Sequence, residues 1–249
     1  RKGKLGPAEV AAEGRGGPAG AAAAIDLGEL KPDYLIIGEP TAGRVAIGEK
    51  GFQGCRVITT GKTAHGALPW EGVNAIEAMA EIIVALRREL WPQLTERTNP
   101  YFQPSAASVN LIEGGVKANV VPDRCEIYID RRALPGDDLK GAVEEVRQIA
   151  ERAVQNVPGA SVEVVAPLSA EAIMNPPDAP QVAAMVEANR FLDLDTELTA
   201  FSMGTDGRHF FARGYLGIIY GPGDPKVAHI QDEYVGVDEL MQATRAYAL

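Results

Sequence analysis

The order of strand and helix patterns between residues 51 and 166 constrains the fold more than any other feature of this sequence. Strand patterns alternate polar and apolar residues, and helix patterns repeat apolar residues every three or four positions. The predicted elements, in chain order, are a strand at 52–60, a helix at 73–90, strands at 106–112 and 120–133, a helix beginning after Pro135-Gly136-Asp137, and a strand at 161–165. This β-α-β-β-α-β order is that of a ferredoxin-like split unit.

The same patterns predict which faces are buried. In strand 120–133, apolar side chains face one way and charged or phenolic side chains face the other. The apolar ones are Cys125, Ile127 and Ile129, and the polar ones are Glu126, Tyr128, Asp130 and Arg132. The residues predicted to be buried are Ile76, Met79, Ala80, Ile83 and Leu86 in the first helix and Leu139, Val143, Val146, Ala150 and Ala153 in the second. The two cysteines, Cys55 and Cys125, are too few for a disulfide framework and are predicted to be buried as small apolar residues.

The segments on either side of this unit indicate an α/β domain. Residues 34–38 form a wholly apolar run that stops at Glu39-Pro40, which is typical of a strand buried on both faces at the centre of a sheet. The other predicted elements are an alanine-rich helix within 14–24, a helix at 179–191, a strand near Leu198, a helix near Arg208, a strand at 216–220 and a helix beginning near Asp238. We therefore predict an α/β domain, 1–50 and 167–249, interrupted by a ferredoxin-like α+β domain, 51–166.

Composition excludes several classes of partner and of enzyme. The chain has 249 residues, and its formal net charge is −10. Nucleic acids and anionic membranes bind basic surfaces, so we expect neither as a partner. No apolar run reaches the roughly 20 residues that span a bilayer, and no signal peptide is recognisable, so we expect a cytoplasmic protein. The absence of dinucleotide, phosphate-loop and nucleophile-elbow motifs disfavours nucleotide-binding proteins and serine hydrolases.

Glu39 and His229 are candidate metal ligands. Each lies in a loop after a predicted apolar strand, and ligands bind at this edge of open α/β sheets. One carboxylate and one imidazole suit zinc or a similar ion, although a zinc site needs three or four ligands. The alternative for Glu39 is a solvated acid at the end of a strand.

His65 and Asn119 lie in loops of the inserted domain. His65 stands among small residues in G-K-T-A-H-G-A-L-P-W. Its ring is either a donor to a developing oxyanion or an ordinary surface histidine. Asn119, in K-A-N-V-V-P, either donates to a substrate or closes the turn before the next strand.

Arg132 and a glycine-rich loop are candidate substrate-binding groups. The Arg132 guanidinium either binds a substrate carboxylate through two hydrogen bonds or pairs with Asp130. The loop contains Gly204, Thr205 and Arg208. It either holds a substrate oxygen through backbone and hydroxyl donors or forms a helix-capping turn.

Six segments together resemble one family. They are I-I-G-E-P-T (36–41), G-K-T-A-H-G-A-L-P (61–69), N-V-V-P (119–122), D-R-R-A-L-P-G-D (130–137), M-G-T-D-G-R (203–208) and G-P-G-D-P-K-V-A-H-I-Q-D-E (221–233). In this order they resemble the dinuclear zinc aminoacylase and carboxypeptidase family, of the acetylornithine deacetylase and succinyl-diaminopimelate desuccinylase type. The resemblance covers nearly the whole chain. It implies a zinc-peptidase-like catalytic α/β domain with an inserted ferredoxin-like dimerisation domain.

The resemblance also implies a function and a role for each candidate residue. Such enzymes use two divalent ions, zinc or alternatively cobalt or manganese, to hydrolyse the amide of an N-acyl amino acid or small peptide. Glu39 and His229 are then ligands of different ions. His65 is then the lid histidine that stabilises the oxyanion in the other subunit of a homodimer. The implied substrate-binding residues are Arg132, Asn119, Gly204, Thr205 and Arg208.

The sequence departs from the family pattern on its N-terminal side. No histidine precedes His65, so the family's His-x-Asp motif is absent. The family's Glu-Glu pair is represented only by Glu13, the candidate general base. We therefore expect the N-terminal part of the enzyme to be missing, metal occupancy to be low and this chain by itself to be inactive. The alternative is a non-catalytic homodimer that binds a carboxylate ligand or acts in assembly.

Overall fold

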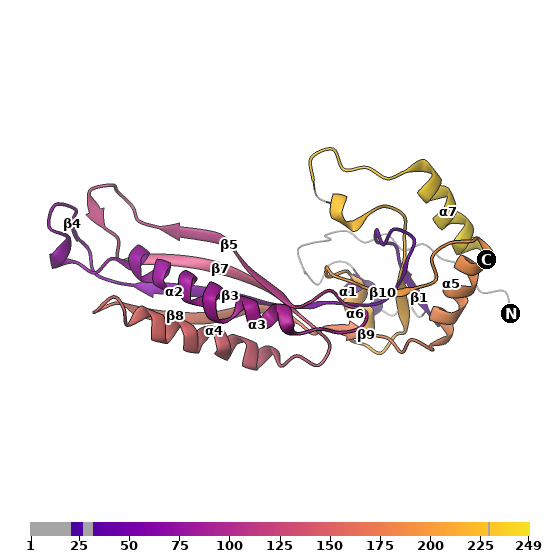
Figure 1. The fold of residues 1–249 in the computed structure, drawn as a ribbon, viewed down its shortest axis with the longest axis horizontal. Helices are drawn as coiled ribbons and strands as arrows, with labels where there is room; N and C mark the ends of the chain where they lie inside the picture. Colours follow the sequence, from indigo (N-terminus) through magenta and orange to yellow (C-terminus); the bar gives the residue numbers. More distant parts are fainter. Residues whose placement is uncertain (1–20, 27–31, 229) are drawn as a thin grey trace. The chain divides into compact units, whose positions relative to one another are not determined.

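The computed structural model of this protein describes residues 21–26, 32–228 and 230–249. The chain divides into two compact units (Figure 1). One unit is Lys50–Ala172, and the other combines the described residues up to Glu49 with Ile173–Leu249. In the part of the chain that the structure describes, no helix is long and apolar enough to cross a membrane.

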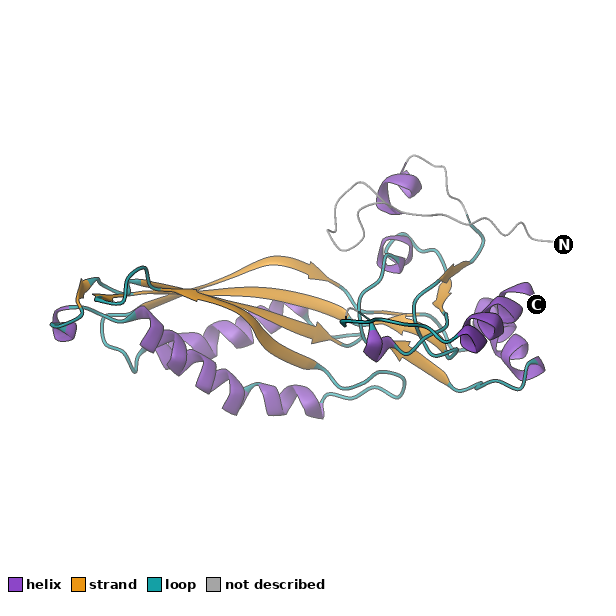
Figure 2. Ribbon diagram, turned by 90° about the horizontal axis from the view of Figure 1, so that it is seen from above, coloured by secondary structure: helices purple, strands orange, loops and turns teal. Residues whose placement is uncertain are grey.

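The unit Lys50–Ala172 is a four-stranded antiparallel sheet with two long helices. Its elements are β3 (Gly51–Thr60), β4 (Ala64–His65), the 3-10 helix η1 (Pro69–Glu71), α2 (Ala75–Glu89), α3 (Trp91–Glu96), β5 (Ala106–Gly114), β6 (Val120–Val121), β7 (Arg124–Ala133), α4 (Leu139–Val154) and β8 (Ser161–Ala170). The strands lie in the order β5-β7-β3-β8. Helices α2 and α4 cover the same face of the sheet (Figure 2). This arrangement confirms the predicted ferredoxin-like fold.

Side-chain burial in this unit follows the predicted alternation on β7. Cys125, Ile127 and Ile129 are buried against the helices. Both cysteines are free and buried, as predicted, and burial raises the pKa of the Cys55 thiol to about 11. Arg131 also faces the core side and is 1% exposed. The strand therefore carries one buried cation among its apolar residues.

The predicted buried stripe of the first helix is partly wrong. Helix α2 buries Ala75, Ala78, Met79, Ile82 and Leu86. Of the residues predicted to be buried, Ile76 is 39% exposed, Ala80 is exposed and Ile83 is half-buried. The helix begins at Ala75 because the Asn74 side chain accepts hydrogen bonds from the backbone amides of Ile76 and Glu77. The backbone of Ala75 is also held at both ends, by the Thr59 hydroxyl and by the Pro122 carbonyl. These contacts turn the small alanines, rather than Ile76, toward the sheet.

Two predicted strands have different bounds in the structure. Strand 120–133 is divided into β6 and β7 at Pro122, because proline has no N–H to donate to a ladder. The last strand, predicted to end at 165, continues to Ala170. Its pairing with β3 shifts register between Gly54 and Arg56. This bulge accommodates Pro167 within the strand.

The second unit is built on a mixed sheet. Its elements are α1 (Ala21–Asp26), β1 (Leu35–Ile37), β2 (Val45–Glu49), β9 (Ile173–Met174), α5 (Pro180–Phe191), β10 (Leu198–Phe201), α6 (Gly207–Phe211), β11 (Gly217–Ile219), the 3-10 helix η2 (Pro225–Val227) and α7 (Val237–Ala248). The strands lie in the order β1-β11-β2-β10, and β9 pairs with β2. The pairs β1/β11 and β10/β2 are parallel, and β11/β2 is antiparallel.

The centre of this sheet differs from the prediction. Residues 34–38 were expected to be buried on both faces, but the Ile36 side chain is 42% exposed. The reason is that β1 pairs only with β11 among the described strands and so ends the sheet. The strands buried along their whole length are β11, which was predicted, and β2, which was not. The V-A-I-G-E sequence of β2 is short, and it ends in a charged residue.

Candidate functional site

The loops that follow β1 and β11 lie against each other. Because these strands are parallel neighbours, both loops leave the same edge of the sheet. The Thr41 amide donates to the Gly221 carbonyl at 3.2 Å, and the Ala42 amide donates to the Gly223 carbonyl at 2.8 Å. A Cβ atom at Gly221 would lie 2.5 Å from the Glu39 carbonyl oxygen, so this approach requires glycine. The loop of Glu39 is thus joined to the loop that leads toward His229.

Two of the predicted site residues lie outside the described residues. These are Glu13, the candidate general base, and His229, the candidate histidine ligand. The proximity of Glu39 and His229 therefore stays a prediction. Within the described ranges, no group of three or more His, Cys, Asp or Glu side chains could hold a metal ion. Glu39 by itself does not make a metal site.

Glu49, at the end of β2, is a candidate site residue that the sequence analysis missed. Its side chain is buried, with 1% of the residue exposed. One carboxyl oxygen, Oε2, accepts the Thr205 amide at 2.9 Å and the Thr205 hydroxyl at 2.5 Å. The Thr205 hydroxyl oxygen in turn accepts the Gly207 amide at 2.9 Å. No motif marks Glu49, because its partner is 156 residues away along the chain.

The surroundings of Glu49 raise the pKa of its carboxyl group toward neutral pH. Burial raises the pKa of its carboxyl group from the usual 4.5 to about 7. The hydrogen bonds from Thr205 and the positive charge of Arg208 oppose this rise, and the negative charge of Glu39 adds to it. Arg208 and Glu39 are thus both close enough to influence the charge of Glu49.

The loop Gly204–Arg208 forms a local turn, and its binding of a substrate oxygen stays a prediction. The Thr205 hydroxyl oxygen accepts the Gly207 amide just before α6, whose N-cap residue is Asp206, and the amide and hydroxyl donors of Thr205 are both occupied by Glu49. Arg208 is half-buried, and its side chain has no hydrogen bond or ion pair to any described residue. A Cβ atom at Gly204 would lie 3.5 Å from the Arg208 Nη1 atom. Arg208 is therefore the group in this loop with donors to offer a ligand.

His65 and Asn119 are brought together in the unit Lys50–Ala172. Strand β4 pairs with β6, with His65 opposite Val120, and the Gly66 amide donates to the Asn119 carbonyl at 2.8 Å. The imidazole is exposed, and its Nδ1 atom accepts the Ala67 amide at 3.1 Å. Because Nδ1 is an acceptor, the neutral ring carries its proton on Nε2. His65 thus presents an N–H donor to its surroundings.

Arg132 shows the local pairing that the sequence left open. Its Nε and Nη2 atoms donate to the two carboxylate oxygens of Asp130 at 2.7 and 2.9 Å. The two side chains are 33% and 25% exposed. A substrate carboxylate bound by Arg132 would have to share the guanidinium with Asp130 or displace it.

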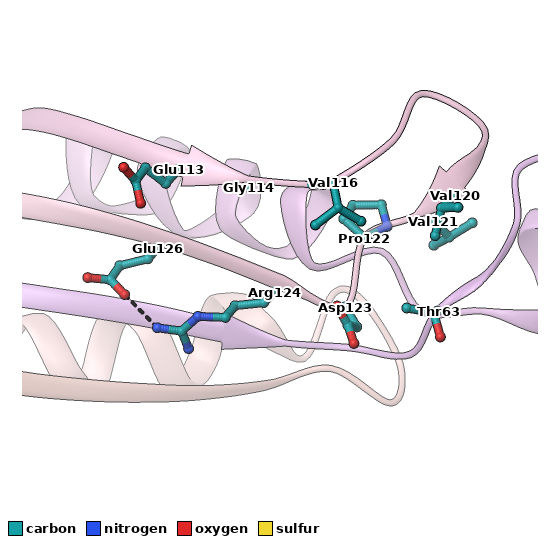
Figure 3. A pocket seen from close by; sticks show the side chains of 11 residues that line it. Thr63, Glu113, Gly114, Val116, Val120, Val121, Pro122, Asp123, Arg124 and Glu126 are labelled. Carbon is teal, nitrogen blue, oxygen red and sulfur yellow. Dashed lines mark hydrogen bonds and ion pairs between the residues drawn. The ribbon is translucent and has the colours of Figure 1, made fainter.

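A cleft of about 240 Å³ lies between the ends of β5 and β7 (Figure 3). On one wall Arg124 pairs with Glu126 at 2.6 Å, and Glu126 also pairs with Arg56 at 2.5 Å. Glu113 and Asp123 line the cleft as well. Val120 and Val121 of β6 form another wall. The cleft therefore borders the strand that pairs with His65, but neither His65 nor Asn119 lines it.

Known proteins resemble this chain over most of its length. Residues 47–158 match the M20 peptidase dimerisation domain. An acetylornithine deacetylase of Myxococcus xanthus is 27% identical over 93% of this chain and 60% of its own length. An acetylornithine deacetylase of Vibrio atlanticus (strain LGP32) is 32% identical over 84% of this chain and 54% of its own length.

A solved structure agrees with the fold. The YXEP protein of Bacillus subtilis, described as a dinuclear metal binding peptidase from the M20 family, is 17% identical. It superposes with a TM-score of 0.65 over 92% of this chain and 60% of its own chain. The present chain thus spans little more than half the length of the proteins that it matches. The domain match and the curated relatives agree with the family that the six sequence segments predicted, that of the M20 peptidases, and the solved structure agrees with its fold.

Proposed function

We propose that the function is metal-dependent hydrolysis of the amide bond in an N-acyl amino acid or small peptide. The observation that carries this proposal is the junction of the loops after β1 and β11, one of which contains Glu39 while the other leads to His229. Similarity to acetylornithine deacetylases supports the N-acyl amino acid as the substrate class.

We propose Glu39 and His229 as ligands of two different divalent ions. Zinc is the ion that a carboxylate and an imidazole suit, and cobalt or manganese are alternatives. The description of the B. subtilis protein as dinuclear supports a pair of ions. Because Glu39 and His229 would give each ion a single ligand where a zinc ion needs three or four, we expect this 249-residue chain to bind metal weakly and to hydrolyse slowly.

The other candidate residues would act on the substrate. His65, with its proton on Nε2, would donate to the oxyanion that forms after attack on the carbonyl. Asn119 lies beside it and would assist. Arg208 would bind the substrate carboxylate, with Gly204 and Thr205 shaping its loop, and Arg132 would contribute if its bond to Asp130 is exchanged. Glu13 remains the candidate general base.

The test is deacylation of N-acetyl-L-ornithine by two polypeptides. One is this chain, and the other is this chain extended with the part of the M. xanthus enzyme that it does not match. We expect the extended polypeptide to release amine with added zinc and to stop when a chelator is added. We expect this chain by itself to be much slower. An extended, folded polypeptide that binds zinc and releases no amine would exclude the proposed reaction.

A non-catalytic homodimer that binds a carboxylate ligand is the second candidate function. It is favoured by the finding that no three candidate ligands gather within the described ranges. Metal content separates the two candidates. Stoichiometric zinc in the extended polypeptide supports the enzyme, and carboxylate binding without zinc supports the alternative.

A further inference from the structure

The strongest unexplained contact in the structure joins Glu49 to Thr205. Glu49 is the last residue of its unit before Lys50 begins the other. Both side chains are buried, with 1% and 4% of the residues exposed. Both donors of Thr205 reach the same carboxyl oxygen, and the Thr205 hydroxyl oxygen also accepts the Gly207 amide. These three hydrogen bonds define the path of the backbone from Thr205 to Gly207.

Burying a carboxyl group is unfavourable unless it is well bonded. Glu49 has no ion pair among the described residues, and the cation that influences it is Arg208. An apolar residue at the end of β2 would fill the space without this cost, but it would leave the Thr205 amide and hydroxyl buried without acceptors. The carboxyl group is therefore needed as the acceptor for the Thr205 donors of the loop, and the packing of the sheet does not require it.

We propose that Glu49 is a positioning residue: by binding Thr205 it fixes the loop Gly204–Arg208 and holds the Arg208 guanidinium where it binds the carboxylate of the substrate. This inference rests on the proposed function, because it takes its ligand class from there. Arg208 follows Gly207 directly, so the bond from Gly207 to Thr205 sets the starting point of its side chain. Its guanidinium stays free for a ligand because Glu49 accepts from Thr205 instead of forming an ion pair with Arg208.

The test uses variants of the 249-residue chain. Glu49→Gln keeps an oxygen that accepts both Thr205 donors, and Glu49→Ala removes it. Thr205→Val keeps the amide donor and removes the hydroxyl that receives the Gly207 amide, whereas Thr205→Ser keeps both groups. Arg208→Ala removes the proposed anion-binding group. Glu197→Ala, an exposed acid of the same unit, is the control.

Two measurements report whether the loop Gly204–Arg208 is held in place and whether it binds a carboxylate. Amide hydrogen exchange, followed by NMR, reports whether the amides of Thr205 and Gly207 are protected. Titration with N-acetylglycine, followed through the amide shifts of the loop, reports carboxylate binding. Circular dichroism verifies that each variant is folded. If Glu49→Ala fails to fold, Thr205→Val replaces it, because this variant removes the hydroxyl that accepts the Gly207 amide, whose protection is then measured.

We expect Glu49→Ala to lose protection at both amides and to weaken N-acetylglycine binding about tenfold or more. Arg208→Ala should weaken binding to a similar extent, and the double variant should be no weaker than Arg208→Ala. Glu49→Gln and Thr205→Ser should stay within about threefold of wild type, as should the Glu197→Ala control. If Glu49 only stabilised the fold, Glu49→Ala would lower stability, and its effect on binding would add to that of Arg208→Ala.

Three results would overturn the proposal. They are unchanged protection and affinity in folded Glu49→Ala, additive effects of the Glu49 and Arg208 variants, and a wild-type chain that does not bind N-acetylglycine. Hydrolysis is not measured in this test. A failure of the extended polypeptide to release amine would therefore count against the proposed reaction while leaving the role of Glu49 standing.

Discussion

At the scale of single residues, the raised pKa of Glu49 predicts an unusual dependence of stability on pH. In the folded chain its pKa is about 7, against 4.5 as the usual value, so the folded state binds this proton more tightly. The contribution of this group to the free energy of unfolding is therefore fully present below pH 4.5 and is lost as pH rises through 7. The loss is at most about 3 kcal/mol. Glu49→Gln, which does not titrate, should lack it.

Urea unfolding of the wild type and Glu49→Gln between pH 5 and pH 8 measures this term. The difference between the two free energies of unfolding should change with pH in the stated direction. Parallel curves for the two proteins would show that the carboxyl group titrates normally in the folded chain.

His65 carries a second prediction at this scale. The Ala67 amide donates to Nδ1, so the neutral ring should be the Nε2–H tautomer, which long-range ¹H–¹⁵N NMR spectra identify directly. In the extended polypeptide, His65→Ala should lower turnover by roughly a hundred- to a thousand-fold with little change in KM, because the oxyanion exists only after attack. An unchanged turnover, or a dominant Nδ1–H tautomer, would contradict the oxyanion role.

At the scale of elements, β7 and α4 are joined by a buried ion pair. Arg131 Nη1 donates to the Glu145 carboxylate at 2.6 Å and to the Ala142 carbonyl at 3.0 Å. Arg97 also donates to Glu145, at 2.7 Å. Burial opposes the ionisation of Glu145, but the bonds from both arginines outweigh it, and the pKa of this carboxyl is lowered. The stability that it contributes is therefore present at neutral pH and is lost as pH falls through this lowered pKa.

Glu145→Gln tests this ion pair, because it leaves the Arg131 charge buried without its counter-charge. We expect a loss of about 2 kcal/mol at pH 7 in urea unfolding, which is less than for a fully buried pair because Glu145 is 37% exposed. Glu144→Gln is the matched control, since its partner Arg147 is exposed, and it should cost less than about 0.5 kcal/mol. Equal losses of unfolding free energy in the two variants would show that the buried Arg131 does not make its ion pair more important for stability.

At the scale of the whole molecule, we propose a homodimer formed through the unit Lys50–Ala172. The M20 dimerisation match covers most of this unit. Among the described strands β5 pairs only with β7, and its Leu111 and Ile112 side chains are 66% and 58% exposed. An exposed strand edge with apolar side chains is a surface that a second copy can pair with across a two-fold axis.

Light scattering at micromolar concentration should therefore give the mass of two chains. Ile112→Asp should shift the equilibrium toward the monomer, because it places a charge on the proposed interface without disturbing the core. Val116→Asp is the control, since Val116 is 85% exposed and lies beyond the end of β5. A monomeric wild type, or equal effects of the two substitutions, would exclude dimerisation through this edge.

The sequence by itself determined the order of the main elements of the unit Lys50–Ala172 and the resemblance to a family. Alternation along β7 predicted the burial of Cys125, Ile127 and Ile129, because neighbouring residues of a strand face opposite sides of the sheet. Such periodic patterns are local, so they can be read without knowledge of the fold. The family came instead from the resemblance of six segments, and the candidate residues Glu13 and His229 lie outside the described residues.

Only the tertiary structure decided which polar groups meet. Glu49 binds Thr205 across 156 positions of sequence, and Arg132 pairs with Asp130 where the sequence left a substrate clamp equally open. Arg131, next to Arg132 in sequence, points into the core and pairs with Glu145. Such contacts depend on distances through space and on desolvation, which neither composition nor periodicity contains. For this reason the buried acid at the end of β2 became visible only when its strand was seen beside the loop of Thr205.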